Sequence, residues 1–354
     1  MKRILTGDRP TGKLHLGHYV GSLKNRVRLQ DEYECFFIVA DLHTLTTKPE
    51  LKDTQELKEN IYQMVLDYLS VGIDPEKATI YVQSQIAEVA ELAIIFGNLT
   101  TVPRLERMPT LKDVMRDAHI TIPSYGLLGY PVLQAADILM VRSHLVPVGK
   151  DQVSHIEITR EIAREFNRVY GKSSQSTSEE SKPTSEVSGQ VFPVPEALVP
   201  EDLGILPGTD GKAKMSKSAG NVINLSDTAG EVEKKVMNMY TDPKRIHATD
   251  PGRVEGNPVF IYLDAFGPEN LKSQISNLKS RYTKGQVGDI EVKKFLVKVL
   301  NNFLDPIRKS RARFERDPEL VERILKEGTE KARSEAQKTL EEVKKAMKLD
   351  YFMD

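Results

Sequence analysis

The chain has 354 residues, which is more than one compact core usually holds, so two domains are expected. Its composition, 39% hydrophobic and 29% charged, is that of an ordinary globular protein in water, and no apolar run approaches the ~18 residues that a membrane span needs. A net charge of −1 excludes attraction of nucleic acid by the molecule as a whole, so a nucleic-acid partner would need a local basic patch.

The first half of the chain alternates short apolar runs with amphipathic segments. Strands are expected at residues 4–6, 35–40, 80–82 and 144–148, and helices at residues 14–30, 51–71, through the 80s and 90s, and 151–170. Unbroken apolar strands between helices predict a parallel sheet that is covered on both faces. The predicted fold class is therefore α/β, with a doubly wound, Rossmann-like parallel sheet whose ligands lie outside the carboxyl ends of the strands.

The second half of the chain has a different character. The sheet domain is expected to span residues 1–171, and it is followed at 172–190 by a serine-rich stretch with almost no apolar residue, which predicts a flexible insertion. Residues 191–226 are rich in proline and glycine and are expected to complete the site. Residues 227–354 predict a smaller, all-helical domain, whose last helix, 318–348, is expected to pack back on the sheet domain.

Cys35 is the single cysteine of the sequence, which excludes internal disulfides and cysteine-cluster metal sites. The first residues, MKRILTGDRP, turn polar after Ile4 and Leu5, so no secretory signal is expected. The seven histidines are scattered without ligand spacing, so no metal site in the protein is expected. These features predict a cytoplasmic location.

The stretch TGDRPTGKLHLGH, residues 6–18, lies where the first strand ends and its helix begins. Its glycines allow a tight turn, and a helix N-terminus carries about half a positive charge with free N–H groups, which favours phosphate. His15 and His18 could donate hydrogen bonds to oxygens on which negative charge develops. Gly17 has no side chain, so a flat base could lie against the helix. The alternative is a surface loop with two incidental histidines.

A second motif, KMSKS at residues 214–218, follows the turn-forming sequence PGTDG. Lys214 and Lys217 on such a loop can clamp a polyphosphate and neutralise a leaving pyrophosphate, although a Lys/Ser pentamer alone is usually solvated surface. Together, HLGH on the first helix and KMSKS about 200 residues later resemble the two signature motifs of the class I aminoacyl-tRNA synthetases. The resemblance implies that the two histidines of HLGH and the two lysines of KMSKS are catalytic in the adenylation of an amino acid by ATP.

The resemblance extends over most of the chain and narrows to the bacterial tryptophanyl-tRNA synthetases through TGDRPTG, DLHTLT, YPVLQAADI and VPVGKDQ. It implies contacts of ATP with Arg9, Pro10, Thr11, Gly17, His18, Gly149, Lys150, Asp151, Ile205, Lys214, Met215, Ser216, Lys217 and Ser218. It also implies that Gln152 and His43 contact tryptophan. Members of the family are homodimers, take ATP with Mg²⁺ carried on its phosphates, and have tRNA(Trp) as a partner.

The segment 130–141, YPVLQAADILMV, is apolar except for Tyr130, Gln134 and Asp137, whose spacings of four and three place them on one helical face. A carboxylate in so apolar a run needs a donor partner, which could be an internal Arg or Lys or else a substrate. The indole N–H is a donor without acceptor character, so a fixed carboxylate complements it. We expect Asp137 to bind the indole, and Tyr130 and Gln134 to hold the amino group of the substrate.

The predicted function is activation of L-tryptophan with ATP to tryptophanyl-adenylate and pyrophosphate, followed by transfer of tryptophan to the 3′-terminal adenosine of tRNA(Trp). Tyrosyl-tRNA synthetases have a similar Tyr, Gln, Asp spacing and are one alternative; a catalytically silent relative that binds tRNA is another. Many tryptophanyl enzymes have Met at the position of Gln134, and a subgroup has Gln. On the tRNA side, five basic residues within nine form either a solvated helix face or a contact with the tRNA backbone: Arg308, Lys309, Arg311, Arg313 and Arg316.

Overall fold

A five-stranded parallel sheet forms the centre of the protein. The computed structural model describes residues 1–149, 153–171, 189–199, 206–211, 214–217, 219–243, 245–247 and 249–352, with the side chains of Leu51 and Asp53 left undescribed. The strand order is β3-β2-β1-β4-β5, and every pair is parallel. The strands are β1 (Arg3–Asp8), β2 (Glu34–Val39), β3 (Ala78–Val82), β4 (Leu145–Pro147) and β5 (Glu196–Leu198). The predicted α/β class is confirmed. The strand β5, which is short and flanked by prolines, was not predicted.

Successive strand residues point to opposite faces of the sheet, and helices bury the apolar side chains on both faces. On one face Ile4 and Phe37 are fully buried against α2 (Lys24–Leu29) and α5 (Leu57–Ser70), and this core continues into the helical region. On the other face Leu5 and Phe36 are buried against α6 (Glu88–Gly97), α9 (Tyr125–Met140) and α10 (Val153–Tyr170). Shorter helical segments complete this part: α3 (Asp41–Leu45), α4 (Leu51–Gln55), η2 (Gln83–Gln85), α7 (Val102–Glu106) and α8 (Pro109–Asp117).

The single helix predicted at residues 14–30 is divided into three segments: α1 (Leu16–His18), the π-helical turn η1 (Tyr19–Leu23) and α2. His15 caps α1 and accepts a hydrogen bond from the backbone N–H of Gly17 at 3.1 Å. A single π-turn inside a helix is often found at a functional site. Periodicity alone predicts the helix but not this local widening, which depends on packing.

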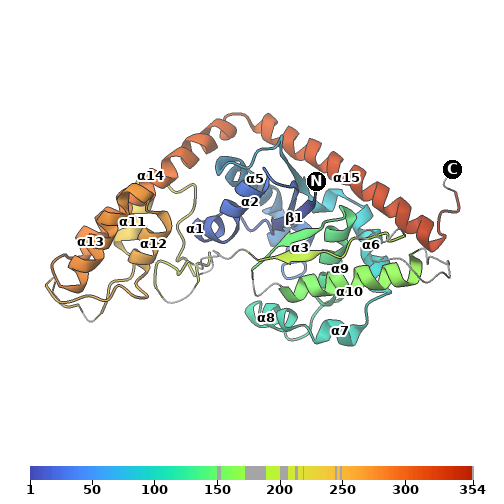
Figure 1. The fold of residues 1–354 in the computed structure, drawn as a ribbon, viewed down its shortest axis with the longest axis horizontal. Coiled ribbons are helices and arrows are strands. Elements are labelled where there is room, and N and C mark those ends of the chain that lie inside the picture. Colours follow the sequence, from blue (N-terminus) through green and yellow to red (C-terminus); the bar gives the residue numbers. More distant parts are fainter. Residues whose placement is uncertain are drawn as a thin grey trace, which may run out of the picture.

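The chain after the sheet domain is helical, and its last two helices are long. The helices are α11 (Ala229–Met237), α12 (Pro258–Phe266), the turn η4 (Glu269–Leu271), α13 (Lys272–Thr283), α14 (Asp289–Glu315) and α15 (Pro318–Met347). Figure 1 shows α14 rising from the helical region and α15 continuing along the sheet domain. Helix α14 packs on α5, α11 and α12, and α15 packs on β3. At Gly328 an added Cβ would lie 2.0 Å from the carbonyl oxygen of Ile80, so this contact requires glycine.

Candidate active site

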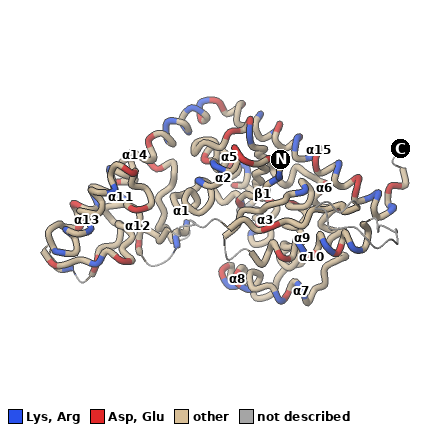
Figure 2. Tube along the Cα trace, in the orientation of Figure 1, with Lys and Arg blue, Asp and Glu red and all other residues tan. Residues whose placement is uncertain are grey.

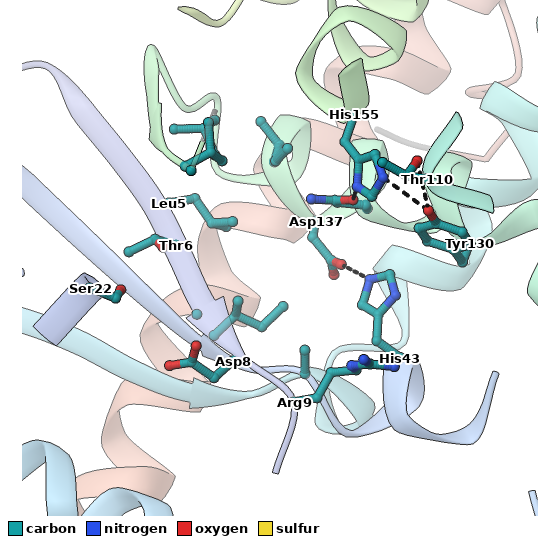
Figure 3. A pocket seen from close by; sticks show the side chains of 18 of the residues that line it. Leu5, Thr6, Asp8, Arg9, Ser22, His43, Thr110, Tyr130, Asp137 and His155 are labelled. Atoms are coloured by element: carbon teal, nitrogen blue, oxygen red, sulfur yellow. Dashed lines mark hydrogen bonds and ion pairs between the residues drawn. The ribbon is translucent and has the colours of Figure 1, made fainter. Parts of the chain in front are cut away.

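A cavity of about 680 Å³ opens at the carboxyl ends of β1 and β4. The strand order reverses between these two strands, and in doubly wound sheets ligands bind at such a point. The cavity wall includes residues 5–9 at the end of β1 and residues 146–149 at the end of β4. Side chains of α3, α8, α9 and α10 close its other sides, as Figure 3 shows for His43, Thr110, Asp137 and His155.

Asp137 lines this cavity, on the same face of α9 as Tyr130 and Gln134, as the sequence predicted. Its side chain is 3% exposed, and its Oδ2 lies 2.9 Å from Nε2 of His43. The side-chain amide of Gln83 donates to the same carboxylate, at 3.0 Å to Oδ1 and 2.8 Å to Oδ2. Burial raises the pKa of the Asp137 carboxyl above its usual range, while the His43 and Gln83 hydrogen bonds act in the opposite direction. Among the described residues no Lys or Arg pairs with Asp137, so an internal ion pair of that kind is not its partner there.

A second polar chain lines the cavity beside Asp137. The Tyr130 hydroxyl lies 2.9 Å from Nε2 of His155, and Nδ1 of the same imidazole lies 2.9 Å from Oε1 of Gln134. The hydroxyl also contacts Oγ1 of Thr110 at 3.2 Å. Sequence reasoning found Tyr130 and Gln134 but missed His155, Thr110 and Gln83. In the sequence, His155 stands among the apolar positions of an amphipathic helix. This pattern does not distinguish a binding residue from a core histidine until its tertiary neighbours are known.

His15 and His18 lie next to one another at the start of α1, with ring centroids 3.8 Å apart. The pKa of His15 is lowered to about 3, first by burial and then by the charges of His18, Lys217 and Lys214. Burial likewise lowers the pKa of His18 to about 4, although Asp8 acts against this shift. Both imidazoles are therefore neutral near pH 7, and each can donate one hydrogen bond to a ligand oxygen without carrying a charge.

The KMSKS loop lies against the HLGH segment, although about 200 residues separate them in the chain. Nζ of Lys217 donates to the backbone oxygen of Thr11 at 3.0 Å and to its hydroxyl at 3.3 Å. Met215 is buried, and a Cβ added to Gly17 would lie 3.3 Å from its sulfur atom. Lys214 is exposed and forms an antiparallel backbone bridge with Pro207. The two motifs are thus adjacent, with a lysine ammonium beside the loop that follows β1.

Asp8, at the end of β1, is a charged residue near His18 that the sequence did not single out. It accepts hydrogen bonds from Nη1 of Arg26 at 2.8 Å and from the hydroxyl of Tyr68 at 2.6 Å. Burial acts to raise the pKa of Asp8, but Arg26, His18 and Tyr68 together hold it below its usual range. The carboxylate is therefore ionised, and it fixes the Arg26 guanidinium in the cavity wall.

The predicted site residues fall into three groups. The cavity is lined by Arg9, His43, Tyr130, Gln134, Asp137 and Gly149. Beside the cavity, but not in its wall, lie Pro10, Thr11, His15, Gly17, His18, Lys214, Met215, Ser216 and Lys217. Outside the described residues lie Lys150, Asp151, Gln152, Ile205 and Ser218, and also residues 172–188 of the serine-rich stretch.

The predicted basic surface at residues 308–316 is only partly a surface. Arg311 is buried and paired with Asp67, and Arg308 donates to backbone oxygens of Asp227 and Asn301 at 3.1 Å. Both alternatives, a solvated helix face and a contact with tRNA, are therefore wrong for Arg311, and the guanidinium of the half-buried Arg308 is bonded to backbone oxygens of the same chain. Lys309, Arg313 and Arg316 are exposed. Figure 2 shows basic and acidic residues interspersed along α14 and α15.

Two further properties concern metals and membranes. In the described ranges, no cluster of three or more His, Cys, Asp or Glu side chains has the arrangement of a metal site. None of the helices in those ranges has the length and apolar character needed to cross a membrane.

Comparison with known proteins places this geometry in a family. The family model described as tRNA synthetases class I (W and Y) matches residues 1–305. A tryptophan–tRNA ligase of Treponema pallidum is 54% identical over 349 residues, covering 99% of this chain and 97% of the relative. A tryptophan–tRNA ligase of Chlamydia caviae is 49% identical over 352 residues, covering 98% of this chain and 96% of the relative. The tryptophanyl-tRNA synthetase of Campylobacter jejuni, solved with ADP and tryptophan, superposes with a TM-score of 0.82 at 34% identity over 98% of this chain and 99% of that one.

These relatives match the sequence-based predictions of family, fold class and enzyme activity over nearly the whole length of the chain. The chain therefore belongs to the class I tRNA synthetases for tryptophan and tyrosine, and its activity is that of a tryptophan–tRNA ligase.

Proposed function

We propose that the cavity between β1 and β4 holds tryptophan and ATP together, and that the amino acid is recognised by its indole N–H at Asp137. The proposal depends most on one observation, a buried carboxylate that still has acceptor capacity. An ionised carboxylate has about four lone-pair sites. Among the residues that the structure describes, the donors that reach the Asp137 oxygens are the His43 ring nitrogen and the Gln83 amide. A further N–H donor from a ligand would occupy a remaining site and stabilise the charge.

The amino end of tryptophan is assigned to Tyr130 and Gln134, with Gln152 as a further contact. His155 supports this assignment, because it holds both side chains from one imidazole. The orientation that suits an ammonium ligand has Nδ1–H donating to Gln134 and leaves Nε2 as an acceptor, so that the Tyr130 hydroxyl shares its proton between Nε2 and Oγ1 of Thr110. The lone pairs of the Tyr130 oxygen then accept from the substrate. Such an arrangement needs a neutral His155, so its tautomer is part of the recognition.

ATP is assigned to the loop after β1, the HLGH segment, the loop after β4 and KMSKS. In the reaction a carboxylate oxygen of tryptophan attacks the α-phosphorus of ATP. The bond from that phosphorus to the bridging oxygen breaks, and pyrophosphate leaves with its electron pair. Neutral His15 and His18 would donate hydrogen bonds to phosphate oxygens, and Lys214 and Lys217 would neutralise the leaving group. Mg²⁺ would enter bound to the phosphates of ATP.

The tRNA step and the assembly are proposed from the family. Transfer of tryptophan to the 3′-terminal adenosine of tRNA(Trp) would complete the reaction in the cytoplasm, and the enzyme would act as a homodimer. The exposed side chains Lys309, Arg313 and Arg316 would contribute to the tRNA surface by contacting phosphates, which position a nucleic acid without reading its bases. Light scattering of the purified protein tests the dimer.

The experiment that tests the amino-acid assignment is exchange of labelled pyrophosphate into ATP, run separately with each of the twenty amino acids. We expect exchange with tryptophan and Mg²⁺-ATP. Because the chain contains no tryptophan, fluorescence of the bound amino acid can be read in parallel without protein background. Exchange with tyrosine and none with tryptophan would contradict the proposal.

A further inference from the structure

A buried ion pair joins α14 to α5 at a place that none of the roles assigned above uses. Arg311 on α14 is 4% exposed, and Asp67 on α5 is fully buried. The guanidinium contacts Oδ1 of Asp67 through Nη1 and the side-chain oxygen of Gln63 through Nη2. Its Nε donates to Glu315 at 2.8 Å. The arginine is thus fixed from three directions, and it in turn fixes the Asp67 carboxylate.

The second oxygen of Asp67 reaches the HLGH segment. Oδ2 accepts a hydrogen bond from the backbone N–H of Leu14, with a nitrogen–oxygen distance of 2.6 Å. Leu14 is buried and directly precedes His15. Because it lies before the start of α1, its N–H has no partner within that helix, and a buried N–H requires one. The carboxylate supplies this partner from a helix far away in sequence.

The same segment is held on its other side by residues that follow KMSKS. The N–H of Leu225 donates to the carbonyl oxygen of Leu14 at 2.9 Å, and the N–H of Leu16 donates to Ile223 at 2.9 Å. His15 forms an antiparallel bridge with Asn224 between these contacts. The backbone at the start of HLGH therefore lies between the Asp67 carboxylate and residues 223–225.

Helix α14 also contacts the chain next to residues 223–225, the second of the two supports of the HLGH backbone; the first is the Asp67 carboxylate. Arg308, about one turn before Arg311, donates from Nη1 to the backbone oxygen of Asp227 at 3.1 Å. Asp227 directly follows the turn after residues 223–225, and its side chain accepts from the N–H of Asn224 at 2.9 Å. One helix thus supplies a guanidinium to each of the two supports of the HLGH segment.

Stability alone is a weak explanation for the pair. Moving two charges out of water is costly, and apolar residues of similar volume in the same positions are often as stable or more so. Apolar side chains at positions 67 and 311 would still pack α5 against α14, but they would leave the Leu14 N–H without an acceptor. The Asp67 carboxylate accepts a directed hydrogen bond from Leu14, and Arg311 holds this carboxylate in the orientation that the bond needs.

We propose that Asp67 and Arg311 are positioning residues for adenylation, which set the HLGH backbone, and hence His15 and His18, against KMSKS. The inference rests on the proposed function, which places those histidines beside the phosphates of ATP. Displacing a reacting or stabilising group by ~1 Å can reduce a rate by about 100-fold. The described side chains assigned to tryptophan, His43, Tyr130, Gln134 and Asp137, lie on α3 and α9, and none of them contacts Asp67 or Arg311, so tryptophan affinity is expected to stay unchanged while adenylation slows.

Two variants test this on the full-length enzyme. Asp67→Leu/Arg311→Met removes both charges together and leaves no buried ion unpaired, so it is expected to fold, yet it lacks the acceptor for Leu14. Arg311→Lys keeps the charge but loses the planar fork that binds Asp67 and Gln63 together. The matched control is Arg245→Lys, which alters another buried arginine in an ion pair, and whose partners Asp289, Asp250 and Val287 belong to neither motif.

Four quantities are measured for each protein: melting temperature, single-turnover adenylation rate per titrated active site, KM for ATP, and tryptophan Kd by ligand fluorescence. We expect adenylation about 10- to 100-fold slower in the double variant, and about tenfold slower in Arg311→Lys, with parental tryptophan Kd. Arg245→Lys should have a lower melting temperature than the parent but the parental adenylation rate. A parental rate in folded Arg311→Lys, or in the folded double variant, overturns the inference; if the double variant does not fold, Arg311→Lys decides.

A fifth protein, His18→Asn, separates this inference from the function on which it rests. If His18→Asn adenylates at the parental rate, the proposed role of HLGH fails. If His18→Asn is slow while Arg311→Lys retains the parental rate, the HLGH role stands and the positioning role of Arg311 and Asp67 fails.

Discussion

Replacing Asp137 by Asn is the most direct test of how the enzyme recognises its amino acid. The substitution keeps the shape but replaces a charged acceptor by a neutral amide with one acceptor oxygen. In the parent, Oδ2 faces His43 and both oxygens face the Gln83 amide. An Asn NH₂ group would therefore place a donor against donors, and its single oxygen would serve both neighbours and the substrate.

The magnitude follows from the burial of the site. A hydrogen bond to a charged group contributes about 1.5–3 kcal/mol, and the Asp137 side chain is only 3% exposed, so solvent cannot replace the lost acceptor. We expect kcat/KM for tryptophan to fall roughly ten- to a hundred-fold. An analogue with sulfur in place of the indole nitrogen should be a poor substrate of the parent and should be penalised less by the Asn variant.

The assay is pyrophosphate exchange with tryptophan and the analogue, measured on both proteins beside a thermal melt. Asp41→Asn is the control, because Asp41 is a buried carboxylate near Asp137 that is not in the cavity wall. Equal discrimination between the two substrates by parent and Asn variant would refute indole recognition by Asp137. A lower melting temperature with unchanged discrimination would assign the carboxylate a structural role.

The pH dependence provides a second measure of the same interaction. Burial raises the pKa of Asp137, and an N–H donor from tryptophan favours its ionised form. Binding of tryptophan therefore lowers this pKa and releases protons at a pH near it. We expect tryptophan affinity to be highest at neutral pH and to fall as the pH drops through the pKa of Asp137. A fall of the same size in Asp137→Asn would show that another group is responsible.

Four further outcomes are expected. The pKa values of His15 and His18, lowered from 6.5 to about 3 and about 4, mean that the unfolded chain binds more protons between pH 6.5 and 4. The free energy of unfolding should therefore rise with pH in that window, by at most about 1.4 kcal/mol per pH unit for each histidine. When this free energy is measured by urea titration at several pH values, it should change less with pH in each of the two His→Asn variants than in the parent. His155→Ala removes the His155 partner of the part-buried Gln134 oxygen and leaves the Tyr130 hydroxyl with Thr110, at a cost of about 1–3 kcal/mol, and should raise the tryptophan KM; an unchanged KM argues against its role. Lys217→Ala should slow single-turnover adenylation by about 100- to 1,000-fold with little change in tryptophan Kd, whereas an unchanged rate would make KMSKS a surface loop. Deleting residues 174–186, which contain almost nothing apolar, should leave exchange near normal; a folded deletion protein without activity would give this stretch a function.

The sequence by itself was sufficient where the information is local. Unbroken apolar runs such as residues 35–40 predict buried parallel strands, because a strand covered on both faces has no polar side. HLGH and KMSKS are readable as motifs because their chemistry depends on neighbouring residue types. The spacing of Tyr130, Gln134 and Asp137 predicts one helical face because the α-helix has a fixed period.

Contacts between distant segments were decided only by the tertiary structure. Nothing in the sequence near Asp137 indicates that its partners are His43 and Gln83, which come from two other strand ends. The basic run on α14 shows the limit most clearly. Charge and spacing are the same whether an arginine faces water or an aspartate, and only the packing of α14 on α5 buries Arg311 against Asp67. Burial is a property of the assembled fold, so a run of charged residues cannot by itself distinguish a surface from an interior ion pair.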